Sequence, residues 1–338
     1  PQELELGVNK MKPDFWNDKN VFITGAKGFV GSWLSRALVE KDANVVILIR
    51  DEHPRKKLSH LEESYSRLNG IVWGDITNYG FIERIFNEYE IDTCFHLAAQ
   101  AIVGSANRSP LSTFESNIKG TWNILEAARN TATLKRLVVA SSDKAYGEHE
   151  KLPYTEEHWL NALHPYDASK ACGDILARTY FHTYNLPLVV ARCANIYGGG
   201  DLNFSRIIPD TIRSVLQGKN PVIRSDGTPV RDYMYVLDAV NAYLSLAEEM
   251  DREGVKGEAF NFGSEKPVTV LELVNTIIRI SGKTSLEPII AGRGKARGEI
   301  QKQYLSIEKA RRILGWKPEY HLEKGLEETI KGYQNFGA

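Results

Sequence analysis

The sequence contains little cysteine and no excess of charge of one sign. Three cysteines occur among the 338 residues, Cys94, Cys172 and Cys193, and no two of them form a CxxC pair. We therefore expect neither a disulfide framework nor a zinc module. Lysine and arginine number 42 and aspartate and glutamate 43, a net charge of −1. A chain without a positive field is a poor candidate for binding nucleic acid.

Long apolar runs are also missing. The longest strictly aliphatic run, Val45 to Ile49, is far shorter than the ~20 residues that span a bilayer. Residues 1–20 are polar and mixed in charge, without the pattern of a signal peptide. We expect a cytoplasmic protein with no membrane partner and no metal site. Its 42% hydrophobic content argues against a disordered chain.

Short β-branched runs alternate with longer amphipathic stretches over the first 192 residues. This rhythm is typical of βαβ units, in which helices cover both faces of a parallel sheet. It predicts an α/β fold with a doubly wound parallel sheet of the Rossmann kind. Helices are expected within Ser32–Lys41, Ser112–Asn130 and Tyr166–Tyr184. The expected strands are Val21–Thr24, Val45–Ile49, Ile71–Gly74, Thr93–Leu97, Arg136–Ala140 and Leu188–Arg192.

The rhythm changes after Arg192, where prolines separate shorter elements. We expect a smaller, interleaved C-terminal lobe that binds substrate. The expected division is 1–192 plus about 232–262 for the dinucleotide-binding domain, and about 193–231 plus 263–338 for the second lobe. Within that lobe, Gly292–Gly298 is a basic, glycine-rich loop.

Three glycines, Gly25, Gly28 and Gly31, lie between the first expected strand and the first expected helix, in VFITGAKGFVGSWL. Glycine allows a tight turn, a close approach of the backbone to a diphosphate, and close packing of helix on strand. The helix N-terminus would supply N–H donors to the phosphates. An ordinary loop is the alternative, but the strand–turn–helix context favours a dinucleotide site.

The GxxGxxG spacing resembles the extended branch of the short-chain dehydrogenases/reductases, the NAD-dependent epimerase/dehydratase family. The resemblance extends through FHLAAQ, with His96 as a core histidine, and through ESNIKGT, with Asn117 supporting the active-site helix. The cofactor-binding residues that it implies are Gly25, Gly28, Phe29, Val30, Gly31, Arg50, Asp51, Asp75, Ile76, Leu97, Ala98, Ala99, Gln100, Asn117, Tyr166 and Lys170.

The choice of dinucleotide depends on the end of the second strand. The family often has an acidic residue there for the adenosine ribose, whereas this chain has Ile49 followed by Arg50 and Asp51. A missing carboxylate beside a guanidinium suits a 2′-phosphate and favours NADP. Asp51 could still reach the ribose diol, which leaves NAD open.

Tyr166 and Lys170 form a YxxxK pair in YDASK, and a spacing of four puts both side chains on one helix face. A tyrosine with a pKa of ~10 is a poor base at neutral pH. A neighbouring lysine cation would lower that pKa, so we expect Tyr166 to be the acid–base residue. The pair also occurs by chance on exposed helices, but its position after the fifth strand favours catalysis.

Ser142, Asp143 and Lys144 follow the fifth strand, at the sheet edge where doubly wound proteins bind ligands. A charged pair after the hydroxyl residue resembles the nucleotide-sugar 4,6-dehydratases of the family. The resemblance implies that Asp143 is the acid that protonates a departing 6-hydroxyl and that Lys144 is the base at C5. A solvated loop with an incidental ion pair is the alternative.

The motifs RCANIYGGGD and PVRDYMYV extend the resemblance and imply that Asn195 and Arg231 bind the sugar phosphate and the nucleotide diphosphate. Arg297 in the basic loop is a further candidate for holding the nucleotide, or else a solvated loop residue. Arg192 has either a structural role or a role in the site. The family also implies a homodimer formed by the two long helices near 112–130 and 167–184.

Together the motifs most resemble the CDP-glucose 4,6-dehydratases, while Ile49-Arg50 resembles GDP-mannose 4,6-dehydratases. The expected reaction converts an NDP-hexose to an NDP-4-keto-6-deoxyhexose. A 4-epimerase, which does not need Asp143-Lys144, is the alternative within the family. A non-catalytic NAD(P)-binding sensor is the alternative from another class.

Overall fold

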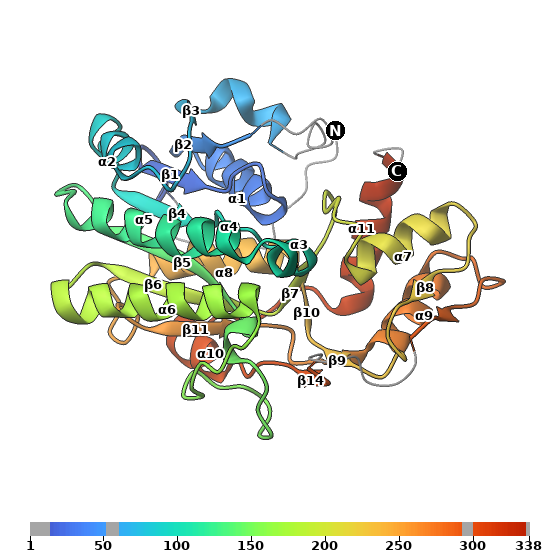
Figure 1. Ribbon diagram of the computed structural model, residues 1–338. Helices are drawn as coiled ribbons and strands as arrows, with labels where there is room; N and C mark the ends of the chain where they lie inside the picture. Colours follow the sequence, from blue (N-terminus) through green and yellow to red (C-terminus); the bar gives the residue numbers. More distant parts are fainter. Residues whose placement is uncertain (1–13, 52–60, 293–299, 336–338) are drawn as a thin grey trace.

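A parallel seven-stranded sheet forms the centre of the molecule, in the strand order β3-β2-β1-β4-β5-β6-β11. The structure is a computed structural model that describes residues 14–51, 61–292 and 300–335 (Figure 1). The expected doubly wound α/β fold is confirmed. The strands are β1 (Asn20–Thr24), β2 (Asn44–Ile49), β3 (Gly70–Trp73), β4 (Thr93–His96), β5 (Arg136–Ser142), β6 (Leu188–Cys193) and β11 (Ala259–Phe262).

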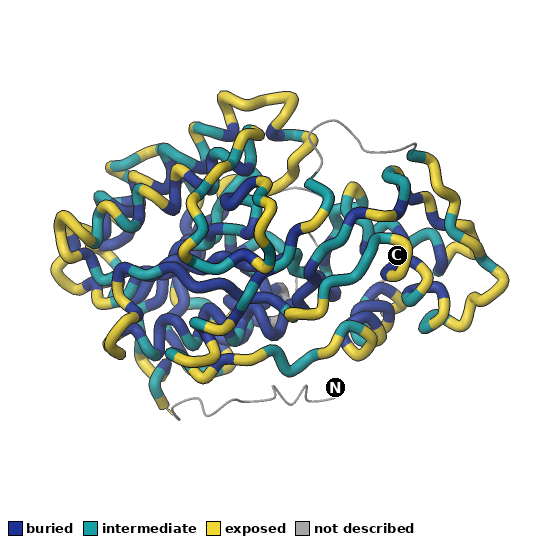
Figure 2. The backbone as a smooth tube through the Cα atoms, turned by 90° about the horizontal axis from the view of Figure 1, so that it is seen from below, coloured by how far each residue is buried: buried dark blue, intermediate teal, exposed yellow. Residues whose placement is uncertain are grey.

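Each strand alternates its side chains between two hydrophobic cores, one on each face of the sheet. In β1, Val21 and Ile23 join one core and Phe22 joins the other. Helices α1 (Phe29–Glu40) and α8 (Val236–Glu248) cover the first face. The second face is covered by α2 (Tyr79–Glu88), α5 (Gly120–Arg129) and α6 (Pro165–Tyr184). Figure 2 shows the buried backbone running through the sheet between these layers.

The sheet takes its last strand from a distant part of the sequence. β11 pairs with β6 in parallel, with Phe260 opposite Ala191. Between β6 and β11 the chain leaves the sheet, forms β7 to α8, and then returns to add β11 beside β6. The division into two lobes at the boundaries expected from the sequence remains a prediction.

The remaining elements lie mostly beside the carboxyl ends of the sheet strands (Figure 1). This region contains three small sheets. One has three strands in the order β12-β9-β14, and the other two are the strand pairs β10-β7 and β13-β8. The strands are β7 (Asn195–Tyr197), β8 (Val222–Ile223), β9 (Val230–Arg231), β10 (Tyr233–Tyr235), β12 (Val268–Thr269), β13 (Ile289–Ile290) and β14 (Lys302–Gln303). The helices are α3 (Val103–Arg108), α4 (Pro110–Phe114), α7 (Ile207–Leu216), α9 (Val270–Ile280), α10 (Glu308–Leu314) and α11 (Leu322–Asn335), with short turns η2 (Glu62–Arg67), η3 (Glu115–Lys119) and η4 (Asp143–Tyr146).

The helix expected over residues 112–130 is not uniformly α-helical. It consists of α4, the π-helical η3 and α5. A π-helical turn accommodates an extra residue and often lies at a functional site, and here it carries Asn117. Among the described residues, no helix is long and apolar enough to cross a membrane.

Candidate active site

The glycine turn has the geometry that a bound diphosphate requires. Gly25 has a φ of +74°, a conformation that side chains other than glycine rarely adopt. A Cβ at Gly31 would lie 2.2 Å from the carbonyl oxygen of Gly25, so the turn can close only without one. Helix α1 begins at Phe29, with no side-chain cap and no acidic residue in its first turn. The residues present therefore fit a dinucleotide, whose diphosphate would face the positive end of α1.

The residues after β4 lie against this turn. The Ala98 N–H donates a hydrogen bond to Thr24 Oγ1 over 3.1 Å, and a Cβ at Gly25 would meet the Ala98 backbone. Leu97 and Ala99 line the large cavity described below. Gln100 is fixed through its backbone, since its N–H donates to Asn117 Oδ1 over 2.7 Å.

Two further candidate positions lie at the edge of this region. The Asp75 carboxylate accepts the Thr77 N–H, and the Ile76 side chain is buried and packs where Gly120 lacks a Cβ. Arg50 and Asp51 are both exposed, and Arg50 Nε lies 2.6 Å from Asp51 Oδ2. Arg50, which favours NADP, and Asp51, which would favour NAD, therefore form an ion pair with each other.

Asn117 joins the segment after β4 to helix α6. It is buried, and its Nδ2 donates to Ser169 Oγ on α6 over 2.8 Å and to the Gln100 carbonyl oxygen over 3.2 Å. Because one amide contacts both the segment after β4 and the helix carrying Tyr166 and Lys170, it fixes their relative position.

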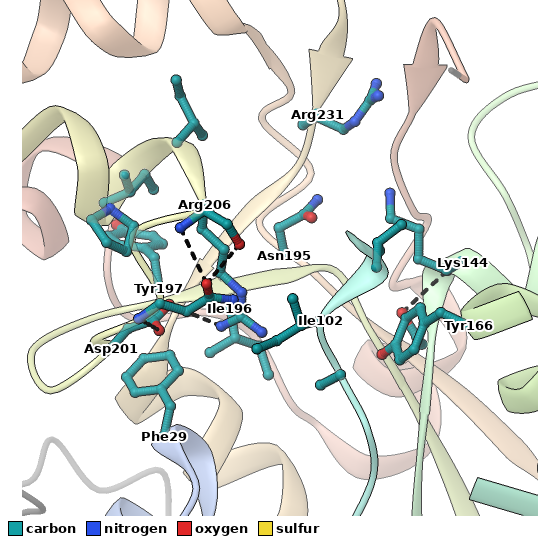
Figure 3. Close-up of a pocket in the computed structure, with 18 of the residues that line it drawn as sticks. Phe29, Ile102, Lys144, Tyr166, Asn195, Ile196, Tyr197, Asp201, Arg206 and Arg231 are labelled. Atoms are coloured by element: carbon teal, nitrogen blue, oxygen red, sulfur yellow. Dashed lines mark hydrogen bonds and ion pairs between the residues drawn. The ribbon is translucent and has the colours of Figure 1, made fainter. Parts of the chain in front are cut away.

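A cavity of about 720 Å³ brings the predicted catalytic and substrate residues together (Figure 3). Its lining includes Ser142, Asp143, Lys144, Tyr166, Lys170, Asn195 and Arg231. These side chains come from the carboxyl end of β5, from η4, from α6, from β7 and from β9, which are up to about 90 residues apart in sequence. Arg297 lies outside the described residues.

Burial governs the titration of the YxxxK pair. It raises the pKa of Tyr166 to about 12, partly offset by the charge of Arg206. It lowers the pKa of Lys170 to about 8. Lys170 Nζ donates to the Ala140 carbonyl oxygen over 2.8 Å. The expectation that a lysine holds the pKa of this tyrosine down is therefore wrong for the protein alone, because desolvation of the phenolate is the larger effect.

Asp143 and Lys144 occupy different environments in the turn η4. Asp143 is 1% exposed and accepts a hydrogen bond from Ser142 Oγ over 3.0 Å. Its Oδ2 is buried and has no hydrogen-bond partner within the part of the chain that the structure describes. Lys144 Nζ donates to Gln303 Oε1 of β14.

Sequence reasoning did not identify three charged or polar groups of the site. Asp167, buried next to Tyr166, has its pKa raised to about 6 by burial, in spite of the Lys144 charge. Arg206 lines the cavity and pairs with Asp201 over 2.9 Å. Gln303 is fully buried. Asp167 lies within the YxxxK motif itself, but no local pattern marks Gln303 or Arg206.

Two residues weighed at the sequence level have structural roles. Arg192 is 1% exposed and forms two hydrogen bonds with the carboxylate of Asp174 on α6. His96 is buried between Thr24 and Thr121 hydroxyls, and burial lowers its pKa to about 3. It is the core histidine that the sequence predicts. The described residues contain no group of three or more histidine, cysteine, aspartate or glutamate side chains placed to hold a metal.

Asn195 begins β7, which pairs with β10, and Arg231 ends β9, which pairs with β12 and β14. Asn195 Nδ2 donates to the Asp232 carbonyl oxygen over 3.1 Å, and Arg231 Nη1 donates to the Gln301 carbonyl oxygen over 3.2 Å. In Figure 3, Lys144 and Tyr166 lie on one side of the cavity, and Asp201 and Arg206 on the other. A lysine and a tyrosine therefore lie at one side of the cavity, and the Arg206–Asp201 ion pair lies at the other.

Comparison with known proteins places these motifs in a family. A family model described as GDP-mannose 4,6 dehydratase matches residues 22–329. The chain is 30% identical to CDP-glucose 4,6-dehydratase of Salmonella typhimurium, over 95% of this chain and 92% of that protein.

Solved structures with the same fold include enzymes of two kinds. A dTDP-glucose 4,6-dehydratase of Bacillus anthracis in complex with NAD has a TM-score of 0.81 and 28% identity, covering 94% of this chain and 97% of that one. A UDP-glucose 4-epimerase of Thermotoga maritima with UDP-glucose has a TM-score of 0.84 and 28% identity, covering 94% and 99%.

Proposed function

Because the chain belongs to the GDP-mannose 4,6 dehydratase family and is an NAD(P)-dependent nucleotide-sugar 4,6-dehydratase, we propose that its substrate is CDP-glucose and its product CDP-4-keto-6-deoxyglucose. One observation carries the assignment of the site. The Asp143-Lys144 pair lines the same cavity as Ser142, Tyr166 and Lys170, so groups for oxidation and for elimination face one substrate.

The first half of the proposed reaction uses α6 and the end of β5. When bound, an oxidised nicotinamide supplies the chemistry that removes a hydride from C4 of the sugar and later returns it to C6. Tyr166 takes the proton of the 4-hydroxyl, and the positive charge of that nicotinamide favours the phenolate that burial disfavours. Ser142 holds the oxygen at C4, and Lys170 orients Tyr166 and the cofactor ribose.

The second half is an elimination across C5 and C6. A ketone at C4 acidifies the C5 proton, which Lys144 removes as its amine. The C5–H electron pair forms the C5=C6 bond while the C6–O bond breaks, and the hydroxyl leaves as water with a proton from Asp143. When the hydride returns to C6, C5 takes its proton back from the Lys144 ammonium. The Asp143 side chain is buried and lines the same cavity as Lys144.

The diphosphate is proposed to lie between the two lobes. Arg231 is the bidentate partner for a phosphate, with Asn195 at the sugar phosphate and Arg297 as a further partner. A CDP nucleotide is favoured by the HLAAQ, SDK and ANIYGGGD motifs, which this chain has in the form typical of CDP-glucose dehydratases.

For the dinucleotide we propose a preference for NADP, carried by Ile49 in place of an acidic residue at the end of β2 and by the adjacent Arg50. An Arg50→Ala variant should then lose affinity for NADP more than for NAD. If the wild type binds NAD more tightly than NADP, and Arg50→Ala does not lose NADP affinity selectively, Asp51 would be the residue that contacts the adenosine ribose.

We propose that the protein is a homodimer formed through the α4–α6 region. Leu111 is 73% exposed, Trp122 43% and Ile175 54%, an unusual set of apolar side chains for a surface facing water. Sedimentation analysis of the wild type and of Ile175→Glu tests this: a dimer that the variant converts to a monomer supports the interface.

The decisive experiment is mass spectrometry of the products formed from CDP-, GDP-, dTDP- and UDP-hexoses, together with the bound cofactor. A product lighter than the substrate by one water, formed fastest from CDP-glucose, supports the proposal. An isomer of unchanged mass would identify a 4-epimerase. Tight cofactor binding with no turnover of any substrate would identify a sensor.

A further inference from the structure

Gln303 contacts both members of the proposed acid–base pair. Its Oε1 accepts a hydrogen bond from Lys144 Nζ, and its Nε2 donates to the main-chain carbonyl oxygen of Asp143 over 3.0 Å. Gln303 is fully buried and lies 159 residues beyond Lys144 in the chain. A buried amide with both ends satisfied fixes the groups that it contacts, since breaking either bond leaves an unpaired polar atom.

The strand that carries Gln303 also contacts the phosphate end of the cavity. β14 pairs in parallel with β9, where Gln303 lies opposite Arg231. The Val230 N–H donates to the Gln301 carbonyl oxygen over 2.8 Å, and Arg231 Nη1 donates to the same oxygen. One short strand of the smaller lobe therefore connects the diphosphate arginine to the turn that carries Lys144.

We propose that Gln303 is the positioning residue of the elimination step, holding the Lys144 amine at C5 through a neutral partner that does not trap it as ammonium. The inference rests on the proposed function, in which Lys144 is the base at C5. A carboxylate in the same place would stabilise the ammonium and raise the pKa of Lys144, whereas an amide oxygen accepts a hydrogen bond without a net charge.

The charges around Lys144 make the neutrality of this partner matter. Asp167 on α6 is close enough to interact with Lys144 electrostatically, Asp143 precedes it in the same turn, and Arg231 on β9 lines the same cavity. A carboxylate at position 303 would add negative charge beside the amine and favour its protonated form.

Two variants of similar side-chain length test the proposal. Gln303→Met removes both hydrogen bonds, and Gln303→Glu keeps the shape but supplies a carboxylate. For Gln303→Met we expect kcat to fall by about 10- to 100-fold, part of the ~10²–10⁴ contributed by a positioned acid–base group, with KM changed by less than about threefold. Reduced nicotinamide should build up during turnover, because oxidation at C4 continues while elimination is slowed.

For Gln303→Glu the acidic limb of the kcat–pH profile should move to higher pH by about one unit.

The matched control is Lys302→Met on the same strand. The Lys302 side chain is exposed next to the buried Gln303, so its loss should change neither the pH profile nor the level of reduced nicotinamide. Circular dichroism and thermal melts of all three variants identify any loss of folding. If Gln303→Met does not fold, the pH profile of Gln303→Glu alone decides the proposal.

A second measurement does not depend on turnover. Competitive labelling of lysine amines with acetic anhydride as a function of pH reports the titration of Lys144, which should move to higher pH in Gln303→Glu and stay unchanged in Lys302→Met. A wild-type protein that forms no dehydrated product would refute the proposed function, while the labelling still tests the contact. An active wild type with an unchanged kcat–pH profile and unchanged labelling in Gln303→Glu would overturn the role of Gln303.

Discussion

Arg192 and Asp174 form a fully buried ion pair directly behind the proposed active site. Arg192 Nε lies 2.8 Å from Asp174 Oδ2, and Arg192 Nη2 lies 2.7 Å from Asp174 Oδ1. The third nitrogen, Nη1, donates to Tyr146 Oη, which donates in turn to Asn261 Oδ1 of β11. The pair joins strand β6 to helix α6, and thereby fixes the helix that presents Tyr166 and Lys170 to the cavity.

Breaking this pair should destabilise the fold strongly. Arg192→Met leaves the Asp174 carboxylate buried without its partner, which costs about 3–5 kcal/mol of unfolding free energy. Urea unfolding measures the change, and the double variant Arg192→Met/Asp174→Leu should recover part of it. The control is Arg36→Met, which breaks the partly exposed pair with Glu40 and should change the stability by less than about 1 kcal/mol. A stability of Arg192→Met equal to that of the wild type would contradict the structural role.

Adding one methyl group to the glycine turn should weaken dinucleotide binding. In Gly31→Ala the new Cβ meets the Gly25 carbonyl oxygen, so the turn must open and the first turn of α1 moves away from the diphosphate. We expect the affinity for NAD and NADP to fall at least about tenfold, equivalent to ~1.4 kcal/mol, as measured by calorimetric titration. Gly80→Ala on α2, where the atom nearest to the added Cβ is Asn78 Oδ1 at 3.9 Å, is the control and should bind as the wild type does. Equal binding by both variants would place the cofactor elsewhere.

The buried carboxyl of Asp167 should make the stability depend on pH. Burial raises its pKa in the folded protein to about 6, above the ~3.9 of an unfolded chain. The folded state therefore holds this proton more tightly, and the resulting stabilisation is complete below pH ~4 and lost as the pH rises through ~6.

Asparagine at this position carries no such charge. Relative to the wild type, Asp167→Asn should gain about 1–3 kcal/mol of unfolding free energy between pH 4 and pH 8. Urea unfolding of both proteins at the two pH values gives the difference. If the unfolding free energies of Asp167→Asn and the wild type differ by the same amount at pH 4 and at pH 8, the Asp167 carboxyl does not titrate in this range.

The two halves of the proposed reaction should fail in different ways. Tyr166→Phe removes the group that takes the 4-hydroxyl proton, so oxidation itself slows and little reduced nicotinamide forms. Asp143→Asn leaves oxidation intact but removes the acid for the departing 6-hydroxyl, so reduced nicotinamide should persist. In both variants kcat should fall by ~10²–10⁴, followed by absorbance of the reduced cofactor and by product mass. A Lys144→Ala variant with full turnover to dehydrated product would exclude Lys144 as the base.

Features encoded over short stretches could be predicted from the sequence. The six strands from Val21 to Arg192 and the turn around Gly28 follow from side-chain periodicity and from glycine spacing. The YxxxK spacing likewise placed Tyr166 and Lys170 on one helix face. Such patterns act through neighbours within a few residues, where backbone geometry alone decides which side chains share a face.

Only the tertiary structure decided the environment of these groups. Gln303 contacts Lys144 across 159 residues, Arg192 pairs with Asp174 across 18, and desolvation raises the pKa of the half-buried Tyr166 where the sequence predicted a fall. Burial and long-range hydrogen bonds arise when separate elements pack together, and no local pattern encodes that packing. The sequence by itself therefore determined the α/β fold and the types of side chain proposed for catalysis, while the packing of distant elements determined their hydrogen-bond partners and their degree of burial.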